Sequence, residues 1–455
     1  MGILLTTEHS RLFLPSRDFH LPRRIQYKHV CLSQFITSLS PSAAPAKKED
    51  SMRHACISRV PVIFLMLLAC SLLSSCDASP RHQTGCSFWQ IVASPNPGNV
   101  GDGLSGVFAL ASDNIWVTGS FASTSTSTDN RTLVEHWNGK TWSVVPSLNP
   151  SPEGEGNYPD SLGIIAGSSA NDIWAVGDGL GGFLEHWDGS AWRAVDTPAP
   201  PRSIYSYSFS SVSVLSPTSA WVVGRAMERT FIKGDGNGDL ALTAHWDGKA
   251  WSIVSTPNLH ADLNGTELAD VVALAPDNVW AVGSTSSIER GQLALIEHWD
   301  GKAWSVVSNP QPQGMDSKGT AALWSLAPLS PSDIWAAGFY ELPGAVSMRY
   351  LVEHWDGRAW SIVPTPAPAR KLDNLRHIVA ISDHDVWALT YNGSLLNWNG
   401  KVWRLSTLPN ADQNGYSVSN LAALPNGQVW LVGTVHDPTG PGPRTLIARS
   451  VQSCS

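Results

Sequence analysis

Glutamate and histidine side chains that stand beside tryptophan are the residues of this chain best suited to chemistry. The triplet Glu-His-Trp recurs, for example at 185–187, 297–299 and 353–355. Carboxylate and imidazole groups can bind a metal ion or transfer protons. Because the triplets recur at a long spacing, a repeat fold would place them on separate sheets, too far apart to form one site. We therefore expect them to serve packing and hydrogen bonding, and we predict no metal site.

Two further polar segments match functional motifs only in part. Residues 235–239 read Asp-Gly-Asn-Gly-Asp, as at the start of a calcium loop, but the glycine and glutamate that such a loop needs further on are missing. Arg376 and His377 lie near the cluster 383–385, in which Asp385 matches a turn position of other repeats, so we expect a structural role. The chain from Cys76 onward carries no nucleophile-elbow, zinc-protease or phosphate-loop motif. The sequence thus predicts no catalytic residue and no cofactor.

Composition and charge limit the class of protein. Of the 455 residues 42% are apolar and only 15% are charged, which excludes disorder for most of the chain. The 38 Gly and 31 Pro residues favour many short strands joined by turns. The net charge is −8, and the part from Cys76 onward has 21 basic and 34 acidic residues, a net charge of −13. This acidic balance argues against nucleic acid as a partner.

One segment has the features of a membrane-targeting signal. The apolar run 60–73 follows Arg53 and Arg59 and is shorter than the roughly 20 residues of a membrane-spanning helix, which favours a signal peptide. The run ends in Leu73-Ser74-Ser75-Cys76, which is similar to the lipobox of bacterial lipoproteins. An ordinary secretory signal cut nearby is the alternative.

The lipobox resemblance implies a division of the N-terminal region and a location. It implies cleavage before Cys76, lipidation of that thiol, and a signal peptide over 52–75. Residues 1–51 would be an unstructured lead or a mis-assigned start, and 76–85 a polar tether. The mature protein would be extracytoplasmic and held at a bacterial cell membrane by lipid alone.

A tryptophan-rich repeat fills the rest of the chain. Twenty of the 21 Trp residues fall on repeated positions, and only Trp324 does not. Trp116 and Trp430 lie 314 residues apart over six repeats, a mean period of about 52. The segments around these two Trp belong to a block that recurs near 172–177, 220–224, 278–283, 333–338 and 385–390. A second block, of the type LVEHWNGKTW, follows each copy but is truncated at 445–450.

The missing piece of the last repeat stands at the start of the fold. Residues 88–95 match the segment 303–308 and its equivalents. A circular offset of this kind is typical of a closed ring in which the N-terminal strand completes the last blade. Each repeat reads as four strands, for example 267–274, 279–283, 294–299 and 303–308 (strands A to D). We therefore predict that 86–455 is an all-β, seven-bladed β-propeller of four-stranded antiparallel blades.

This architecture resembles the kelch, galactose-oxidase-like and Asp-box repeat propellers over about 86–450. The resemblance concerns the arrangement of repeats and implies no site residue. In a ring whose two ends meet, Cys86 and Cys454 would lie close together. We expect a disulfide between them outside the cytoplasm, with two free thiols as the alternative.

Loops of variable length indicate where a ligand could bind. The D–A and B–C connections of such blades leave on one face, and here they are long and unlike one another, as at 225–239 and 339–349. Tyr is favoured at recognition surfaces, although Tyr205, Tyr207 and Tyr416 could instead begin strand A and pack. The seven Tyr of the mature chain all fall in or beside loops of that face: Tyr158, Tyr205, Tyr207, Tyr340, Tyr350, Tyr391 and Tyr416.

These observations predict a non-catalytic, membrane-anchored surface propeller, monomeric, that binds a protein or a glycan through its D–A/B–C face. One alternative is a polysaccharide-processing enzyme with a site at the mouth of the central channel. Another is a purely structural envelope protein.

Overall fold

The computed structural model describes residues 88–451, except for 123–129, 151–159, 179–181, 200–201, 229–238, 258–262, 288–290, 316–317, 407, 409–414, 437–439 and 441. The chain divides into two compact units, Met1–Arg81 and His82–Ser455, and everything described belongs to the second. The predicted signal peptide and Cys76, Cys86 and Cys454 lie outside the described residues. Within the described part, no helix is long and apolar enough to cross a membrane.

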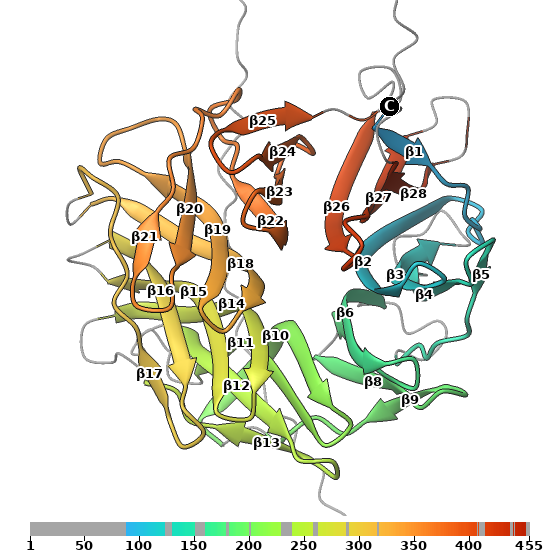
Figure 1. The fold of residues 1–455 in the computed structure, drawn as a ribbon. Helices are drawn as coiled ribbons and strands as arrows, with labels where there is room; N and C mark the ends of the chain where they lie inside the picture. The colour runs from blue at the N-terminus through green and yellow to red at the C-terminus, as the bar shows by residue number, and fades with distance from the viewer. Residues whose placement is uncertain are drawn as a thin grey trace, which may run out of the picture. The chain divides into compact units, whose positions relative to one another are not determined.

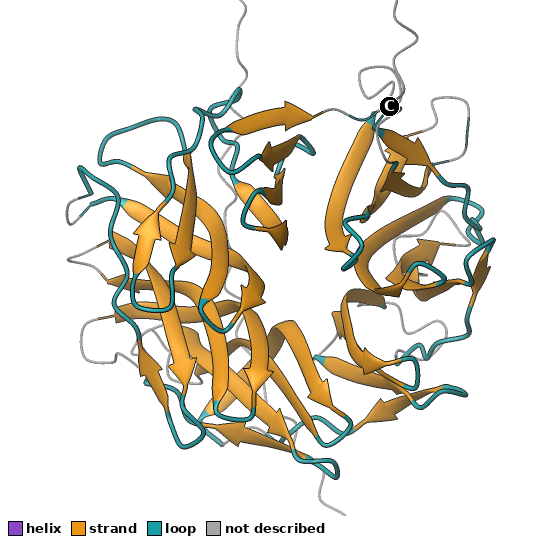
Figure 2. Ribbon diagram, in the orientation of Figure 1, coloured by secondary structure: helices purple, strands orange, loops and turns teal. Residues whose placement is uncertain are grey.

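All regular elements of the described residues are β-strands (Figure 2). The strands are β1 (Trp89–Ile91), β2 (Gly101–Ala111), β3 (Asn114–Ala122), β4 (Asn130–Trp137), β5 (Trp142–Val144), β6 (Ser161–Ser169), β7 (Asp172–Asp178), β8 (Phe183–Trp187), β9 (Trp192–Val195), β10 (Ile204–Ser216), β11 (Ser219–Glu228), β12 (Asp239–Trp246), β13 (Trp251–Val254), β14 (Leu263–Ala275), β15 (Asn278–Ser287), β16 (Gly291–Trp299), β17 (Trp304–Val306), β18 (Thr320–Ser330), β19 (Asp333–Glu341), β20 (Arg349–Trp355), β21 (Trp360–Ile362), β22 (Leu375–Ser382), β23 (Asp385–Thr390), β24 (Leu395–Trp398), β25 (Trp403–Ser406), β26 (Tyr416–Ala423), β27 (Val429–His436) and β28 (Pro443–Ser450).

Successive strands pair in antiparallel groups of four, which confirms the predicted class of sheet. The groups β2–β5, β6–β9 and β22–β25 are separate sheets, and β26–β28 form a sheet with β1. Strands β10–β21 form one twelve-stranded sheet, which the sequence did not predict. Its four-stranded groups are joined only by single parallel residue pairs, Asp239 with Gly265 and Gln292 with Thr320. The first of these pairs arises because β14 begins at Leu263, earlier than expected, so that Gly265 reaches Asp239.

Asp-Gly turns close the outer hairpins. The Oδ1 atom of Asp300 accepts hydrogen bonds from the backbone N–H of Lys302 (2.8 Å) and Ala303 (2.9 Å). Gly301 has φ +90°, a left-handed conformation that glycine adopts without strain. A Cβ at this position would lie only 2.9 Å from the Cβ of Asp277. The turn chemistry read from the sequence therefore fixes the geometry of this hairpin.

The repeated Trp residues pack between neighbouring groups. The Trp of one group's second strand meets the two Trp of the next group's third and fourth strands: Trp116 lies 5.0 Å from Trp187 and 5.9 Å from Trp192 between ring centroids. A buried Trp removes about 150–250 Å² from water, so these trios form much of the core. The same trio recurs as Trp174 with Trp246 and Trp251, Trp221 with Trp299 and Trp304, Trp280 with Trp355 and Trp360, Trp335 with Trp398 and Trp403, and Trp430 with Trp137 and Trp142.

Where it occurs, the Glu-His-Trp triplet joins the third strand to its own sheet. His298 Nε2 lies 2.9 Å from Asn278 Oδ1, and its ring packs at a tilt against that of Trp280, with centroids 4.5 Å apart. Trp299 Nε1 donates to the carbonyl of Pro276 at 3.2 Å, while Glu297 is fully buried. Across the described residues, no three His, Cys, Asp or Glu side chains are grouped so that they could hold a metal ion.

The first described strand lies beside the last. Strand β1 pairs antiparallel with β28, with Trp89 opposite Ser450, and the N–H of Val451 donates to the carbonyl of Phe88 at 2.8 Å. Phe88 also stacks on Trp387 of β23, with ring centroids 5.2 Å apart. The two ends of the described chain therefore belong to one sheet.

The first strand of each group lies innermost (Figure 1). These strands contact one another in chain order, and β26 contacts β2. Four-stranded antiparallel groups arranged around a common centre make a β-propeller. The innermost strands are β2, β6, β10, β14, β18, β22 and β26.

Candidate functional site

Each innermost strand has an irregularity at the same place. In β18 the pairing register shifts between Leu323 and Ser325, and in β22 it shifts between Leu375 and His377. A shift of this kind is a β-bulge, which redirects side chains and is common beside binding sites. The residues passed over by the pairing are Ser105, Gly163, Ser210, Ala269, Trp324, Arg376 and Ser419.

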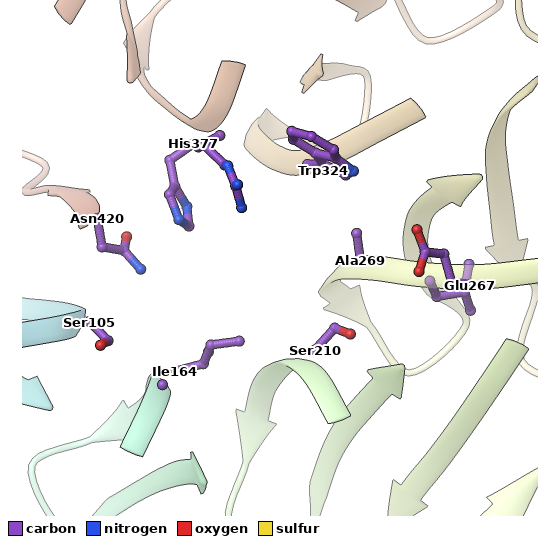
Figure 3. A pocket seen from close by; sticks show the side chains of 11 residues that line it. Ser105, Ile164, Ser210, Glu267, Ala269, Trp324, His377 and Asn420 are labelled. Atoms are coloured by element: carbon purple, nitrogen blue, oxygen red, sulfur yellow. The ribbon is translucent and has the colours of Figure 1, made fainter. Parts of the chain in front are cut away.

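The bulges surround a central cavity of about 390 Å³. All seven innermost strands contribute to its wall, and Figure 3 shows the labelled side chains grouped around one space. Among the bulge residues in this wall, only Trp324 and Arg376 are large. The lining residues are Ser105, Gly163, Ile164, Ser210, Glu267, Leu268, Ala269, Trp324, Arg376, His377 and Asn420.

Two aromatic rings lie close to the guanidinium of Arg376. Its Cζ atom lies 5.0 Å from the Trp324 ring centroid and 4.7 Å from that of Tyr391. Trp324 in turn packs on the buried ring of Phe339, with centroids 4.9 Å apart. No hydrogen bond or ion pair joins the Arg376 guanidinium to another residue in the described part of the chain. The rings restrain a cation whose N–H groups are not used by any described residue.

His377 adds a neutral polar group to the wall. Burial, followed by the charge of neighbouring Arg376, lowers the pKa of its imidazole to about 4. The ring is therefore uncharged at neutral pH and can donate one hydrogen bond and accept another. Of these two neighbours, Arg376 is positively charged at neutral pH and His377 is not.

Glu267 connects the central cavity to a second, polar cavity of about 190 Å³. Its Oε1 atom accepts a hydrogen bond from Ser284 Oγ at 3.4 Å, and Gln292 Nε2 donates to the same Ser284 Oγ at 2.7 Å. The walls of this second cavity are hydroxyl, amide and carboxylate groups with one glycine. They comprise Asp239, Gly265, Thr266, Glu267, Ser284, Ser286 and Gln292.

A partly buried carboxylate, that of Asp270, braces the wall of the central cavity. Asp270 Oδ1 accepts from Ser211 Oγ of β10 at 2.6 Å and from its neighbour Val271 N at 2.9 Å, while Oδ2 accepts from Leu326 N of β18 at 2.7 Å. The N–H of Ile378 in β22 donates to Ser325 Oγ at 3.2 Å. Side chains just after the bulges therefore tie β10, β14, β18 and β22 together.

The structure separates the predicted tyrosines. Tyr391, in the connection between β23 and β24, is 58% exposed and meets the cavity through Arg376. Tyr205, at the start of β10, is equally exposed. Tyr350 is buried and its hydroxyl donates to Asp373 at 2.7 Å.

The other tyrosines of that set are bound into the sheets or lie outside the described residues. Tyr207 donates to Thr197 Oγ1 at 2.7 Å, and Tyr340 and Tyr416 pack partly buried against core clusters. Tyr158 lies outside the described residues. Of the predicted tyrosines, Tyr391 is the one that contacts a lining residue of the central cavity, Arg376, in the described structure.

Sequence reasoning gave several of the cavity residues no functional role. Trp324 was noted only as the Trp outside the repeat, Arg376 and His377 were given a structural role, and Glu267 and Asn420 received none. A usable signal exists: the residue eleven places before each second-strand Trp is small in five repeats and large only at Trp324 and Arg376.

Comparisons with known proteins yield only distant likenesses. No protein-family model matches this chain, and no curated protein matches its sequence. Among solved structures it is similar to YCF48 bound to D1 peptide (14% identity, TM-score 0.46, covering 81% of this chain and 96% of that one). It is also similar to YCF48 from Cyanidioschyzon merolae (13%, 0.47, 80% and 98%) and to a protein of unknown function from Dyadobacter fermentans DSM 18053 (10%, 0.41, 80% and 98%). At such distances likeness carries no information about ligand or partner.

Proposed function

We propose that this chain is a non-catalytic binding protein whose ligand, a protein or a glycan, enters the central cavity from the side of the β23–β24 connection. The observation that carries the proposal is the convergence of all seven innermost strands on one cavity. Within it, the only large bulge residues are Trp324 and Arg376, and they lie side by side. A concave site with an aromatic ring and a few polar groups is the usual form of a ligand pocket.

The scaffold of this proposal is a seven-bladed propeller closed by its N-terminal strand. Three observations support it. Strand β1 pairs with β28, β26 contacts β2, and Trp430 packs on Trp137 and Trp142 as the other second-strand Trp pack on their neighbours. In a closed ring, the cavity has a fixed diameter and its rim residues keep fixed positions.

The anchor of this proposal is lipid on Cys76 at the outer side of a bacterial membrane. The lipobox-like end of the apolar run 60–73 supports it. Mass spectrometry of the mature N-terminus tests it, and an unmodified Cys76 would contradict it.

Substitution at the cavity tests the binding function. The purified full chain is screened against glycan and peptide arrays, and hits are repeated with Trp324→Ala and Tyr391→Ala. We expect each variant to weaken binding by about tenfold or more, because each removes an aromatic contact from the site or its support.

Tyr205→Ala is the matched control, because Tyr205 is as exposed as Tyr391 but begins a different strand. Unchanged binding in both cavity variants, or a loss only in Tyr205→Ala, would overturn the proposal. Circular dichroism of each variant separates a loss of binding from a loss of folding.

A further inference from the structure

We infer that the central cavity takes an acidic sugar, a hexuronate-type ring whose carboxylate is held by the edge of the Arg376 guanidinium. This inference rests on the proposed binding function and specifies the ligand of the same site. Its evidence comes from the way in which Arg376 is held, from the polar groups around it, and from the charge of the molecule.

The guanidinium of Arg376 is the proposed contact for the carboxylate of the ligand. The rings of Trp324 and Tyr391 both lie within 5.0 Å of its Cζ atom, which leaves the N–H groups at the edge of the guanidinium as the contact for a ligand. That edge matches the two oxygens of a carboxylate in a bidentate pair. A guanidinium restrained by rings loses little side-chain entropy on binding, which favours affinity.

The polar walls define the rest of the ligand. Ser105, Ser210 and Asn420 line the same cavity, and Glu267 leads into a second cavity whose side chains are all polar. Hydroxyl, amide and carboxylate groups pair well with the hydroxyls of sugars, which both donate and accept. A peptide would bring apolar side chains, for which the second cavity offers no apolar side chain. The central cavity also presents Ile164, Leu268 and Ala269, so it is the polar second cavity that favours a sugar over a polypeptide carboxyl terminus.

The charge balance limits the ligand to isolated carboxylates. The part of the chain from Cys76 onward has a net charge of −13, and the cavity wall contains one cation, Arg376, and one carboxylate, Glu267. A densely charged polyanion would be repelled by this protein. A sugar with one carboxylate per ring places a single negative charge at Arg376 and hydroxyls at Glu267.

The test compares acidic oligosaccharides with neutral copies of themselves. Oligomers of galacturonate, glucuronate and mannuronate, each with its carboxyl-reduced counterpart, are titrated into the full chain by calorimetry at low salt. We expect at least one uronate to bind about tenfold or more tightly than its neutral counterpart. In Arg376→Ala this preference should vanish, and Arg376→Lys should restore it only in part because lysine lacks the planar fork.

Arg404→Ala is the matched control, since Arg404 is an exposed arginine on the outer strand β25 of the same sheet, and it should leave the preference unchanged. Equal affinity for uronates and neutral sugars, or no uronate binding, would overturn the inference. So would selective binding of peptides with a free rather than an amidated carboxyl terminus. If a neutral sugar or such a peptide binds and Trp324→Ala abolishes it, the proposed function stands and only the acidic sugar is wrong.

Discussion

Four glutamates are fully buried inside the sheets. Glu135, Glu185, Glu297 and Glu353 are all 0% exposed. In the described part of the chain, six of their eight carboxyl oxygens lack a hydrogen-bond partner. Burial raises the pKa of Glu135 and Glu297 to about 8 and that of Glu185 and Glu353 to about 7. The equivalent positions of other repeats hold Ala244, Leu396 and Ala448, so the fold itself does not need a carboxyl group there.

These carboxyls make stability fall as the pH rises. The pKa of Glu297 is about 8 in the folded chain and 4.5 without the fold, so the folded state holds the proton more tightly. The resulting stabilisation is complete below about pH 4.5 and is lost as the pH rises through 8. We expect the urea midpoint to fall from pH 6 to pH 9, and to fall less in Glu297→Gln.

The control for this prediction is Glu341→Gln, at the end of β19, where the pH profile should match that of the unaltered chain. A Glu297→Gln profile parallel to that of the unaltered chain would show that this carboxyl does not titrate as argued. In the same series, the variant Glu297→Leu should have a higher free energy of unfolding than the unaltered chain above pH 8. The reason is that no charge then remains to be buried at this position.

At the scale of the elements, strands and turns could be read from the sequence but the bulges could not. The predicted strand 267–274 lies within β14, and the turn residues Asp300 and Gly301 form the expected hairpin. Alternation and turn chemistry are local signals, so they survive in a single sequence. A bulge depends on how two strands pair, and this pairing is not visible in a single sequence. No local pattern therefore shows that Trp324 and Arg376 face one cavity.

The site was therefore missed for a physical reason. Its residues come from seven strands spread over the repeat region, and none of the repeats contains more than a few of them. The one local signal was deviation from the repeat, which marks Trp324 and Arg376 but not Glu267. The loop tyrosines, chosen by residue type, divide into exposed Tyr391 and buried Tyr350 because their exposure is set by packing.

Asp270 should be essential for the wall formed by β10, β14 and β18. In Asp270→Asn the new amide would place a donor against one of the N–H or O–H donors that now point at the carboxylate. We expect a loss of about 2–4 kcal/mol in the free energy of unfolding, measured by urea titration. Asp277→Asn, in an exposed turn, serves as the control and should cost much less. Equal midpoints for the two variants would contradict the bracing role.

At the scale of the whole molecule, the pairing of the first and last described strands, β1 and β28, is the observation on which the proposed ring depends. Phe88 and Val451 are joined by a backbone hydrogen bond, and Cys86 and Cys454 stand two and three residues beyond them in the sequence. These positions in the sequence are the reason for predicting the disulfide, whose two cysteines lie outside the described residues. It would close a loop of more than 360 residues, for which the chain-entropy model gives at most about 5 kcal/mol.

We expect a non-reducing peptide map to contain one Cys86–Cys454 cross-linked peptide. We also expect reduction to lower the thermal midpoint. Cys86→Ser and Cys454→Ser should lower it equally, and the double variant no further. Alkylation of both thiols in the folded, unreduced protein would refute the disulfide.

The most direct measurement for the central claim is hydroxyl-radical footprinting of the full chain, with and without a bound oligosaccharide or peptide from the arrays. Ligand in the central cavity should protect Trp324 and Tyr391 and leave Tyr205 unchanged. Protection of Tyr205 or of exposed Val346, with Trp324 and Tyr391 reacting as before, would place the ligand elsewhere and contradict the account.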